Sequence, residues 1–329
     1  DLAEAAGIKV DKDNLNTMED VDKLLYQLKE AYPDKYIIEC SQPNGGGWFA
    51  LDDGMGLVFN LSDPECKVVA KEQTDEYLEM AEYAEKWQKD GLIWKDVLTD
   101  KLDHNSLINE GKLITKWGTH EFATQNRAWV EDGAYWDYTE IYADSLFANR
   151  TPLANALCIS ATSENPERTL MFLDLLETDQ TLYDMVQYGI EGKTYVLDGE
   201  AAAYPEGMDG ASSNYQEWGG QWAMWKPQFM RPNASYGPGF WEEEARYAAS
   251  SDKNVVSPLE GFSFNADAVA TEVAQRNQIY GDANKLLAVG LAGDAKTAIE
   301  QLKSDSEAAG LQKILDEYQR QIDEFLASK

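Results

Sequence analysis

The residues of this chain best suited to recognition chemistry are aromatic side chains in loops. Sugar rings are bound by flat apolar faces, which stack on C–H groups, and by planar polar groups, which bind hydroxyls. The chain contains 10 Trp, 17 Tyr and 10 Phe residues, but such a number alone is a weak signal. Position says more, because ligands of open α/β sheets bind at loops beyond the strand ends. Trp48 follows Gly45–Gly47 in such a loop, where it either faces a ligand or packs inward over a tight glycine turn.

Three further positions carry groups whose role the sequence leaves open. Glu121 could accept hydrogen bonds from hydroxyls, or it could stabilise a helix start through the helix dipole. Asn155 interrupts the apolar run 153–159 and could bind a ligand or serve a hinge. A stripe of tryptophans at helical spacing comprises Trp218, Trp222 and Trp225. Such a stripe is more often core than site, and Trp222 is retained as the candidate within it.

The sequence contains no strong metal-binding or catalytic motif. Its two histidines, His104 and His120, match no zinc spacing. Asp11, Asp13 and Asn14 hint at a calcium loop but lack its glycine and its terminal glutamate. The chain has no nucleophile elbow, no phosphate loop and no dinucleotide fingerprint. We therefore expect no metal and no cofactor.

Composition narrows the class of protein. The 329 residues include 28 Lys and Arg against 59 Asp and Glu, a formal net charge of −31. This charge repels phosphate backbones and anionic lipid surfaces, which argues against nucleic-acid binding. The length and the 43% hydrophobic residues suffice for about two domains with a sizeable core. Three cysteines are too few for a disulfide framework, and Cys40 and Cys158 are expected to be buried. No transmembrane run and no signal peptide are apparent.

The elements that would position the candidate residues alternate between helices and strands. Thr17 is expected to cap a helix with an acidic first turn, and a strand over 36–40 follows. A helix is predicted over 74–90, where Gly91 ends it. The sequence of residues 108–118 predicts a helix end, a glycine turn and a strand. The alternation indicates an α/β architecture.

The second half of the chain begins with a predicted buried strand over 153–159. A helix should then start at Pro166 with Asn165 as its cap, and it carries Leu170, Leu173 and Leu176 on an apolar face. Thr178 and Asp179 open another helix, which Gly189 and Gly192 end. Two long helices are predicted at the C-terminus, over 266–291 and 295–326.

Four stretches resemble the extracellular solute-binding proteins of ABC importers. SENPE over 163–167 is similar to a serine and Asn-Pro-Glu element of that family. YGIEGKTY over 188–195 narrows the resemblance to a lipoprotein branch with a C-terminal domain of unknown function, DUF3502. SPLEGFSFN over 257–265 and AGL over 309–311 resemble the beginning and end of that domain, although Asn265 replaces its usual acid. The resemblance extends over residues 1–326.

This resemblance implies an α/β, type II periplasmic-binding-protein-like two-lobe fold, present in part, with a helical C-terminal extension. It implies the C-terminal lobe over 1–150, a return segment of the N-terminal lobe over 151–200 and a mostly helical DUF3502-like domain over 201–329. The first part of the N-terminal lobe, a signal and a lipidated cysteine are expected before Asp1. On this interpretation the chain is N-terminally truncated.

The resemblance also implies capture of a carbohydrate, specifically an oligosaccharide, and its delivery to the permease subunits of an ABC transporter. The protein would be a monomer, lipid-anchored at the extracellular face of the membrane, and would make or break no bond. The loop with Asn44, Trp48 and Asp53 is similar to a ligand-binding loop of maltose-type relatives. Trp117 lies in an element similar to one that faces the cleft, though with Trp-Gly in reversed order. Phe262 follows a returning element where relatives place an aromatic near the ligand.

Two alternatives remain open at this point. A glycoside hydrolase would use two carboxylates at about 5 or 6.5–9.5 Å, and the abundant acids allow such a pair. A non-catalytic surface interaction module would fit the long C-terminal helices. Hydrolysis of a bound glycan would favour the first alternative, and absence of small-molecule binding would favour the second.

Overall fold

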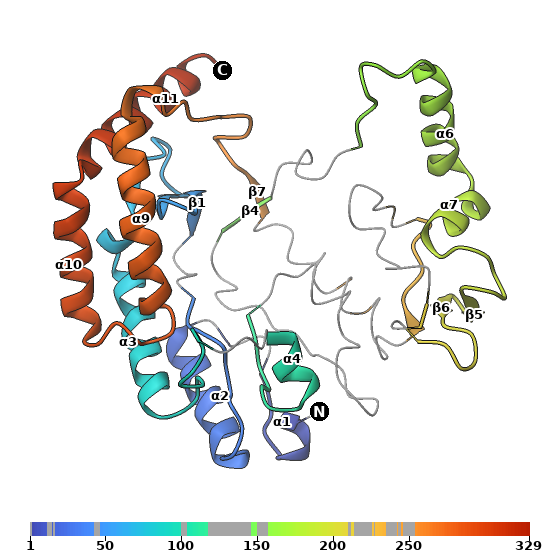
Figure 1. Cartoon of the computed structure of the whole chain (residues 1–329), viewed down its shortest axis with the longest axis horizontal. Helices are drawn as coiled ribbons and strands as arrows, with labels where there is room; N and C mark the ends of the chain where they lie inside the picture. Colours follow the sequence, from blue (N-terminus) through green and yellow to red (C-terminus); the bar gives the residue numbers. More distant parts are fainter. Residues whose placement is uncertain are drawn as a thin grey trace. The chain divides into compact units, whose positions relative to one another are not determined.

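A computed structural model of the chain is drawn in Figure 1. It describes residues 2–11, 15, 17–42, 47–99, 104–117, 146–149, 157–209, 212–213, 226, 228–234, 242, 245 and 254–329. The chain divides into two compact units: unit 1 comprises 1–118, 138–150 and 248–329, and unit 2 comprises 119–137 and 151–247. The boundaries of these units differ from those of the predicted segments 1–150, 151–200 and 201–329, because the C-terminal helices belong to the same unit as most of residues 1–150. Which lobe each segment represents stays a prediction.

Unit 1 begins with α1 (Leu2–Ala5) and α2 (Met18–Ala31). The predicted cap of α2 is confirmed, since the Thr17 side chain accepts from the Asp20 main chain and Asp20 bonds back to Thr17. Apolar residues on one face of α2 are buried, namely Met18, Val21, Leu25 and Leu28. Helix α3 (Asp75–Lys89) begins after Thr74 as predicted, and Gly91 follows it with a φ of +71°.

The predicted strand over 36–40 is an extended segment joined to 113–117 by one parallel bridge, Tyr36 to Leu113. The main-chain N–H of Thr115 donates to the Ile37 carbonyl oxygen at 2.9 Å. On its other side, Ile37 donates to the carbonyl oxygen of Leu92 at 2.7 Å. Helix α4 (His104–Asn109) precedes the second segment. The glycine turn predicted between α4 and the second segment is present, with Gly111 at a φ of +64°.

A three-stranded antiparallel sheet supports the largest core of unit 1. Its strands are β1 (Trp48–Asp52), β2 (Leu57–Asn60) and β3 (Val69–Ala70), in that order. The sheet packs against α11 (Leu311–Ala327), whose Ile314, Leu315, Tyr318 and Ile322 share one apolar cluster with Leu57 and Phe59. The C-terminal helices and the first sheet therefore form one core.

A second core joins α3 to α9 (Ala270–Leu287) and α10 (Ala295–Ala308). Arg276 of α9 is fully buried and binds Glu72 of η1 (Lys71–Gln73) through two bonds of 2.6 and 2.8 Å. Its Nη1 also donates to Ser306 Oγ of α10, at 2.5 Å. Since a buried charge needs such partners, this arginine fixes the three elements to one another. Gly290 has a φ of +71°, and a Cβ there would lie 2.2 Å from the Ala84 carbonyl oxygen.

Three smaller elements complete unit 1 as described. Strand β4 (Phe147–Asn149) pairs in parallel with β7 (Asn254–Val256), and η4 (Asp267–Val269) leads into α9. The predicted long helix over 295–326 is instead two helices, because Gly310 takes a φ of +92° between α10 and α11. Within the part of the chain that the model describes, no helix has the length and apolar character needed to cross a bilayer.

Unit 2 contains α6 (Pro166–Thr178), α7 (Gln180–Gln187) and the hairpin of β5 (Val196–Asp198) and β6 (Ala201–Ala203). Both predicted helix starts are confirmed. Asp179 caps α7 by accepting from the Leu182 main chain at 2.9 Å, whereas Asn165 precedes Pro166 without a side-chain cap bond. Among the described residues of this unit, Tyr183, Tyr188, Tyr195 and Ala202 form a buried apolar cluster.

The predicted buried strand over 153–159 is wrong for its described part. Residues 157–160 have no strand structure, Leu157 is 53% exposed and Cys158 is exposed. Cys66, rather than Cys158, is the fully buried thiol, and Cys40 is half-buried. An apolar run in a sequence indicates burial, but it does not identify the part of the protein that would cover the segment.

Candidate functional site

The two extended segments of unit 1 end at the same edge. They run parallel from the bridge between Tyr36 and Leu113, so their carboxyl ends, 39–41 and 116–117, come together. Ligands of open α/β sheets bind at this edge. We therefore take these ends as the candidate site.

Trp117 is fixed in this site by two hydrogen bonds. Its indole Nε1–H donates to the Cys40 carbonyl oxygen at 2.7 Å, and its main-chain N–H donates to Glu39 Oε1 at 3.2 Å. The ring is only half-buried. An indole held at its polar edge and open on part of its surface is suited to stacking. Trp117 therefore lies at the carboxyl ends of the two extended segments, although its Trp-Gly order is the reverse of that in the similar family element.

Glu39, which accepts the bond from the Trp117 main chain, is 6% exposed. Burial raises the pKa of its carboxyl to about 7, while the bond from the Trp117 main chain and the charge of Lys116 oppose this rise. Burial likewise lowers the pKa of Lys116 and raises that of the Cys40 thiol to about 12. Glu39 therefore changes protonation near neutral pH, so that it can donate or accept a hydrogen bond there.

Several buried polar atoms of unit 1 have no hydrogen-bond partner among the described residues. They include Ser41 Oγ, which belongs to the candidate site, and Trp48 Nε1, at the start of β1. Buried donors are nearly always satisfied by protein, water or ligand. Both groups are thus available to a bound hydroxyl or to water.

Trp48 begins β1, and Asp53 directly follows its last residue. Five residue steps of a strand span about 16 Å, so one sugar ring cannot contact both. Asp53 is 84% exposed at its side chain and lies 3.8 Å from the Lys71 ammonium. Its ligand role stays a prediction, as does that of Trp48, whose main chain pairs with Asn60.

Four predicted binding residues lie outside the described part of the chain: Asn44, Glu121, Asn155 and Trp222. His120 also lies outside the described residues, whereas His104 is the first residue of α4. No group of three or more His, Cys, Asp or Glu side chains that could hold a metal occurs among the described residues. The roles of these residues stay predictions.

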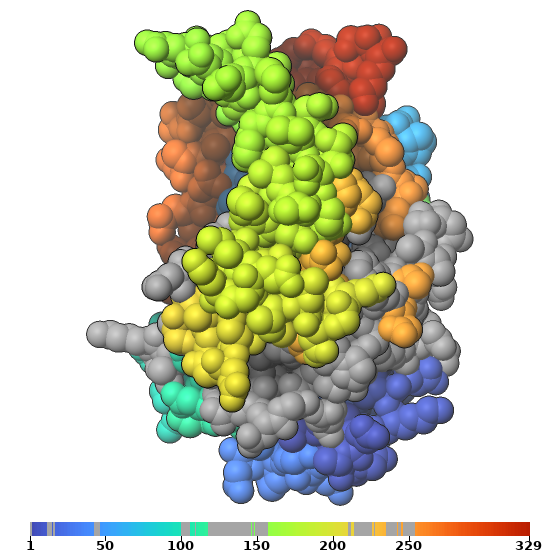
Figure 2. Space-filling model, turned by 90° about the vertical axis from the view of Figure 1, so that its right-hand side faces the viewer, coloured from blue at the N-terminus to red at the C-terminus, as the bar shows by residue number. Residues whose placement is uncertain are grey.

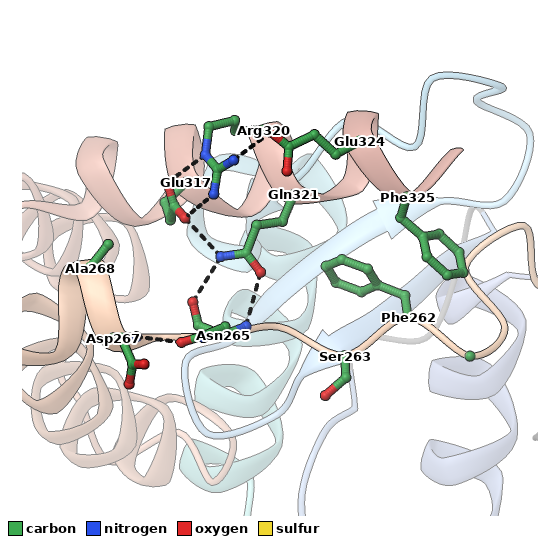
Figure 3. A pocket seen from close by; sticks show the side chains of 11 residues that line it. Phe262, Ser263, Asn265, Asp267, Ala268, Glu317, Arg320, Gln321, Glu324 and Phe325 are labelled. Atoms are coloured by element: carbon green, nitrogen blue, oxygen red, sulfur yellow. Dashed lines mark hydrogen bonds and ion pairs between the residues drawn. The ribbon is translucent and has the colours of Figure 1, made fainter. Parts of the chain in front are cut away.

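Phe262 lines a groove of about 590 Å³ between residues 261–268 and α11 (Figure 3). Its ring packs against Phe325, with centroids 5.6 Å apart, and against Tyr318 at 6.2 Å. Phe264 stacks directly on Tyr318, with ring centroids 3.6 Å apart. The segment is thus attached to the core through its aromatic residues. A ligand role for Phe262 stays a prediction.

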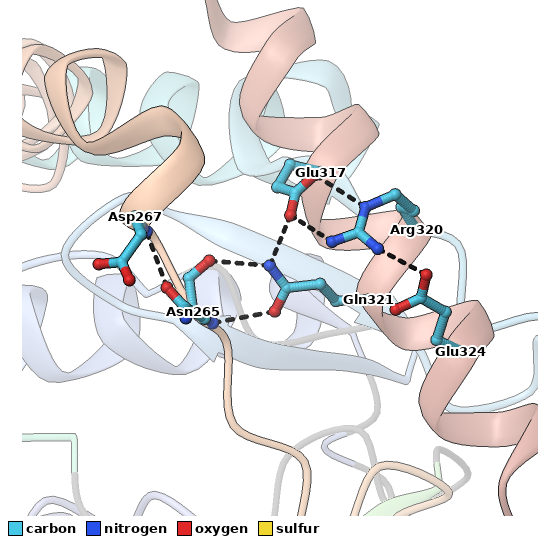
Figure 4. Close-up of polar contacts among 6 residues, drawn as sticks. All are labelled: Asn265, Asp267, Glu317, Arg320, Gln321 and Glu324. Atoms are coloured by element: carbon cyan, nitrogen blue, oxygen red, sulfur yellow. Dashed lines mark hydrogen bonds and ion pairs between the residues drawn. The ribbon is translucent and has the colours of Figure 1, made fainter.

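The polar side chains of this groove bind one another (Figure 4). The Gln321 amide donates to the Asn265 carbonyl oxygen at 2.8 Å and accepts from the Asn265 main-chain N–H at 2.9 Å. Arg320 binds both Glu317 and Glu324, and its guanidinium lowers the pKa of Glu317 to about 2. Because the side chains of Glu317, Arg320 and Gln321 already have partners, these contacts are better explained as the attachment of residues 261–268 to α11 than as a binding site.

The residues that the sequence reasoning missed are Glu39, Ser41 and Lys116. A signal was present, since polar residues directly follow the apolar part of each predicted strand. Their burial, however, depends on the parallel contact between two segments about 77 residues apart, which no local pattern reveals.

The fold is that of the two-lobe solute-binding proteins, and the predicted α/β class with C-terminal helices is confirmed. The crystal structure of an N-glycan transport solute binding protein, NgtS, from Streptococcus pneumoniae matches with a TM-score of 0.76 and 22% identity. The match covers 99% of this chain and 71% of that one. NgtS in complex with Man5GlcNAc matches with a TM-score of 0.69 and 22% identity, over 100% and 71% of the two chains. An HMO binding, ABC-transporter-associated solute-binding protein from Bifidobacterium longum infantis matches with a TM-score of 0.53 and 13% identity, over 99% of this chain and 72% of that one.

Sequence comparison agrees with this class. Residues 258–327 match the family model of a domain of unknown function, DUF3502. A carbohydrate ABC transporter substrate-binding protein of Streptococcus pneumoniae serotype 4 is 23% identical over 324 residues, which is 97% of this chain. The chain spans 65% of the length of that relative.

Proposed function

We propose that this chain belongs to the extracytoplasmic substrate-binding component of an ABC transporter and binds a carbohydrate, specifically an oligosaccharide. The observation that carries the proposal is the agreement along nearly the whole chain with proteins named for this role. The curated relative aligns over 97% of the chain, and the NgtS fold covers 99% of it.

The candidate site supports this function chemically. A half-open indole at Trp117 offers a face for the C–H side of a sugar ring. Glu39 and the unpartnered Ser41 Oγ provide donors and acceptors for hydroxyls beside it. None of these roles requires a bond to be made or broken, so the ligand is captured and released unchanged.

The wider role follows from the same proposal. The binding protein would deliver its ligand to the membrane permease subunits, outside the cytoplasm. Attachment by a lipid anchor, a monomeric state and the assignment of segments to the two lobes belong to this proposal too. The net charge of −31 gives no electrostatic help to an acidic sugar, which favours a neutral oligosaccharide.

Replacement of the indole tests the proposal directly. In the longest chain that the gene encodes, Trp117→Ala should weaken oligosaccharide binding by at least about tenfold, or 1.4 kcal/mol, because the stacking face is lost. Titration calorimetry with Man5GlcNAc, followed by a glycan array if that sugar does not bind, provides the measurement.

Two controls complete this experiment. Trp117→Phe keeps a stacking ring but loses the bond to Cys40, so it should retain more affinity than the alanine variant. Circular dichroism must show that both variants are folded. Equal affinity of Trp117→Ala and the parent would remove Trp117 from the site, and hydrolysis of the bound glycan would replace the transport role with an enzymatic one.

A further inference from the structure

The peptide group between Cys40 and Ser41 makes a hydrogen bond through each of its polar atoms. Its carbonyl oxygen accepts from the indole Nε1–H of Trp117 at 2.7 Å, and its N–H donates to the carbonyl oxygen of Ala288 at 2.8 Å. A peptide group is planar and rigid, so its carbonyl cannot turn unless its N–H turns as well. The bond to Ala288 therefore fixes the orientation of the carbonyl that holds the indole of the candidate site.

Ala288 belongs to the part of the chain that matches DUF3502. It directly follows α9 and lies inside the matched residues 258–327. Its own N–H donates to the Asn284 carbonyl oxygen at 2.9 Å, which makes it the cap of the helix. All of these residues lie in unit 1, and helices α6 and α7 of unit 2, green in Figure 2, supply none of these bonds. The matched segment thus reaches the candidate site through a main-chain contact.

The turn over 288–290 is held against α3, which packs beside α9 (Figure 1). Gly290 takes a φ of +71°, and a Cβ added there would lie 2.2 Å from the Ala84 carbonyl oxygen of α3, closer than Cβ atoms approach in proteins. In the last turn of α9, the Asn284 side chain accepts from the buried Tyr77 hydroxyl of α3 at 2.9 Å. The turn therefore has little freedom to move, and the carbonyl oxygen of Ala288 is a fixed acceptor.

We propose that the turn over 288–290 is a positioning element of the sugar-binding site. It holds the peptide between Cys40 and Ser41, and this peptide holds the polar edge of the Trp117 ring on which the sugar stacks. Hydrogen bonds that follow one another in this way also polarise and strengthen one another. The inference rests on the proposed function and deepens it, because it assigns to part of the DUF3502 segment a role in ligand binding.

Two glycine substitutions close together in the chain test the proposal. Gly290→Ala adds a methyl group against the Ala84 carbonyl oxygen and must displace the turn. Gly293→Ala is the matched control, because Gly293 has a similarly positive φ of +84° but no described atom within 4 Å of its Cβ position. Both variants carry the strain of a left-handed backbone, so the displacement of the turn is what distinguishes them. Each variant is made in the longest chain that the gene encodes.

A single NMR signal can report on both hydrogen bonds. Cys40–Ser41 is the only Cys-Ser pair in the sequence. Cell-free synthesis with cysteine labelled at its carbonyl carbon and serine labelled at its nitrogen therefore gives one correlation from this peptide. The carbonyl shift reports the bond from Trp117, while the shift and the exchange rate of the amide report the bond to Ala288. Trp117→Phe, which removes the indole donor, calibrates the change that loss of the first bond produces.

Without ligand, Gly290→Ala should shift this signal and speed the exchange of the Ser41 amide by at least about tenfold, whereas Gly293→Ala should leave both unchanged. Titration calorimetry with Man5GlcNAc, or with the glycan that the array identifies, follows. Affinity should fall at least about fivefold in Gly290→Ala and stay within about twofold of the parent in Gly293→Ala. Tyr77→Phe, which loses the hydroxyl bond to Asn284 but keeps its ring, is a milder second variant. It should change the signal and the affinity in the same direction.

The proposal is overturned by an unchanged signal in folded Gly290→Ala, or in Tyr77→Phe where the glycine variant does not fold. Equal losses of affinity in Gly290→Ala and Gly293→Ala would also overturn it, because they would assign the effect to backbone strain. A changed signal with unchanged affinity would do the same. Absence of glycan binding by the parent would overturn the proposed function as well, and this outcome is distinguishable because it is seen without any substitution.

Discussion

Among the described residues, the two units of this chain differ in how many large apolar side chains are exposed. Unit 1 joins a three-stranded sheet and four helices through two large clusters, and a fully buried arginine links three of its elements. Unit 2 has a described cluster of four buried residues and a helix, α6, with exposed apolar side chains. Both units follow the same rules of capping and turn formation. The comparison teaches that local helix signals do not say which face of a helix is buried.

The largest expected difference in stability between variants of the two units concerns their ion pairs. Arg276→Ala should destabilise unit 1 by about 3–5 kcal/mol, because it leaves the Glu72 carboxylate buried without its partner. The matched change in unit 2 is Arg231→Ala. Its partner Asp184 keeps a 2.8 Å bond from Gln180, and the Arg231 side chain is 20% exposed. We expect a loss of about 1–2 kcal/mol there. Urea unfolding measures both, and equal losses would contradict the contrast.

Two neighbouring leucines of α6 test the difference within one helix. Leu176→Ala should cost about 2–3 kcal/mol, because it opens a cavity at a buried position. Leu175→Ala should change stability by less than about 0.5 kcal/mol, since Leu175 is 48% exposed. Thermal unfolding followed by circular dichroism provides the measurement. A large cost at position 175 would contradict the exposure of its side chain.

The free energy of unfolding of unit 1 should depend on pH because Glu39 is buried. Its pKa of about 7 in the folded protein lies above its ordinary value of 4.5, so the folded state holds the proton more tightly than the unfolded chain. Stability should therefore fall as the pH rises from about 4.5 to about 7, by an amount on the order of 2 kcal/mol.

Glu39→Gln isolates this effect, because it cannot titrate and still offers an oxygen to the Trp117 main chain. The variant should match the parent near pH 4.5 and exceed its unfolding free energy above pH 7. Parallel stability curves for the two proteins between pH 4.5 and 8 would contradict the raised pKa.

The smallest expected effect concerns the attachment of residues 261–268 to α11. Gln321→Ala removes the reciprocal bonds to the Asn265 main chain, and we expect a loss of about 1 kcal/mol. Gln312→Ala, which removes only an exposed bond to Asp316 in the same helix, is the control and should be nearly neutral. Urea midpoints distinguish them. Equivalent losses in the two variants would show that the attachment to residues 261–268 does not contribute to stability.

The sequence by itself determined the local elements and the class of the fold. The cap at Thr17, the helix ends at Gly91 and Gly189, and the α/β alternation depend on interactions within a few residues, and the structure confirms them. The break at Gly310 was missed, because a helical apolar period continued across it.

The tertiary structure alone decided which groups meet and which surfaces are covered. Glu39 and Trp117 are distant in the chain, and only the parallel contact of their segments buries the carboxyl and shifts its pKa. The apolar residues of α6 look alike in the sequence, yet Leu176 is buried and Leu175 is exposed. Burial depends on a partner surface supplied by another part of the chain, and a local pattern contains no information about that partner.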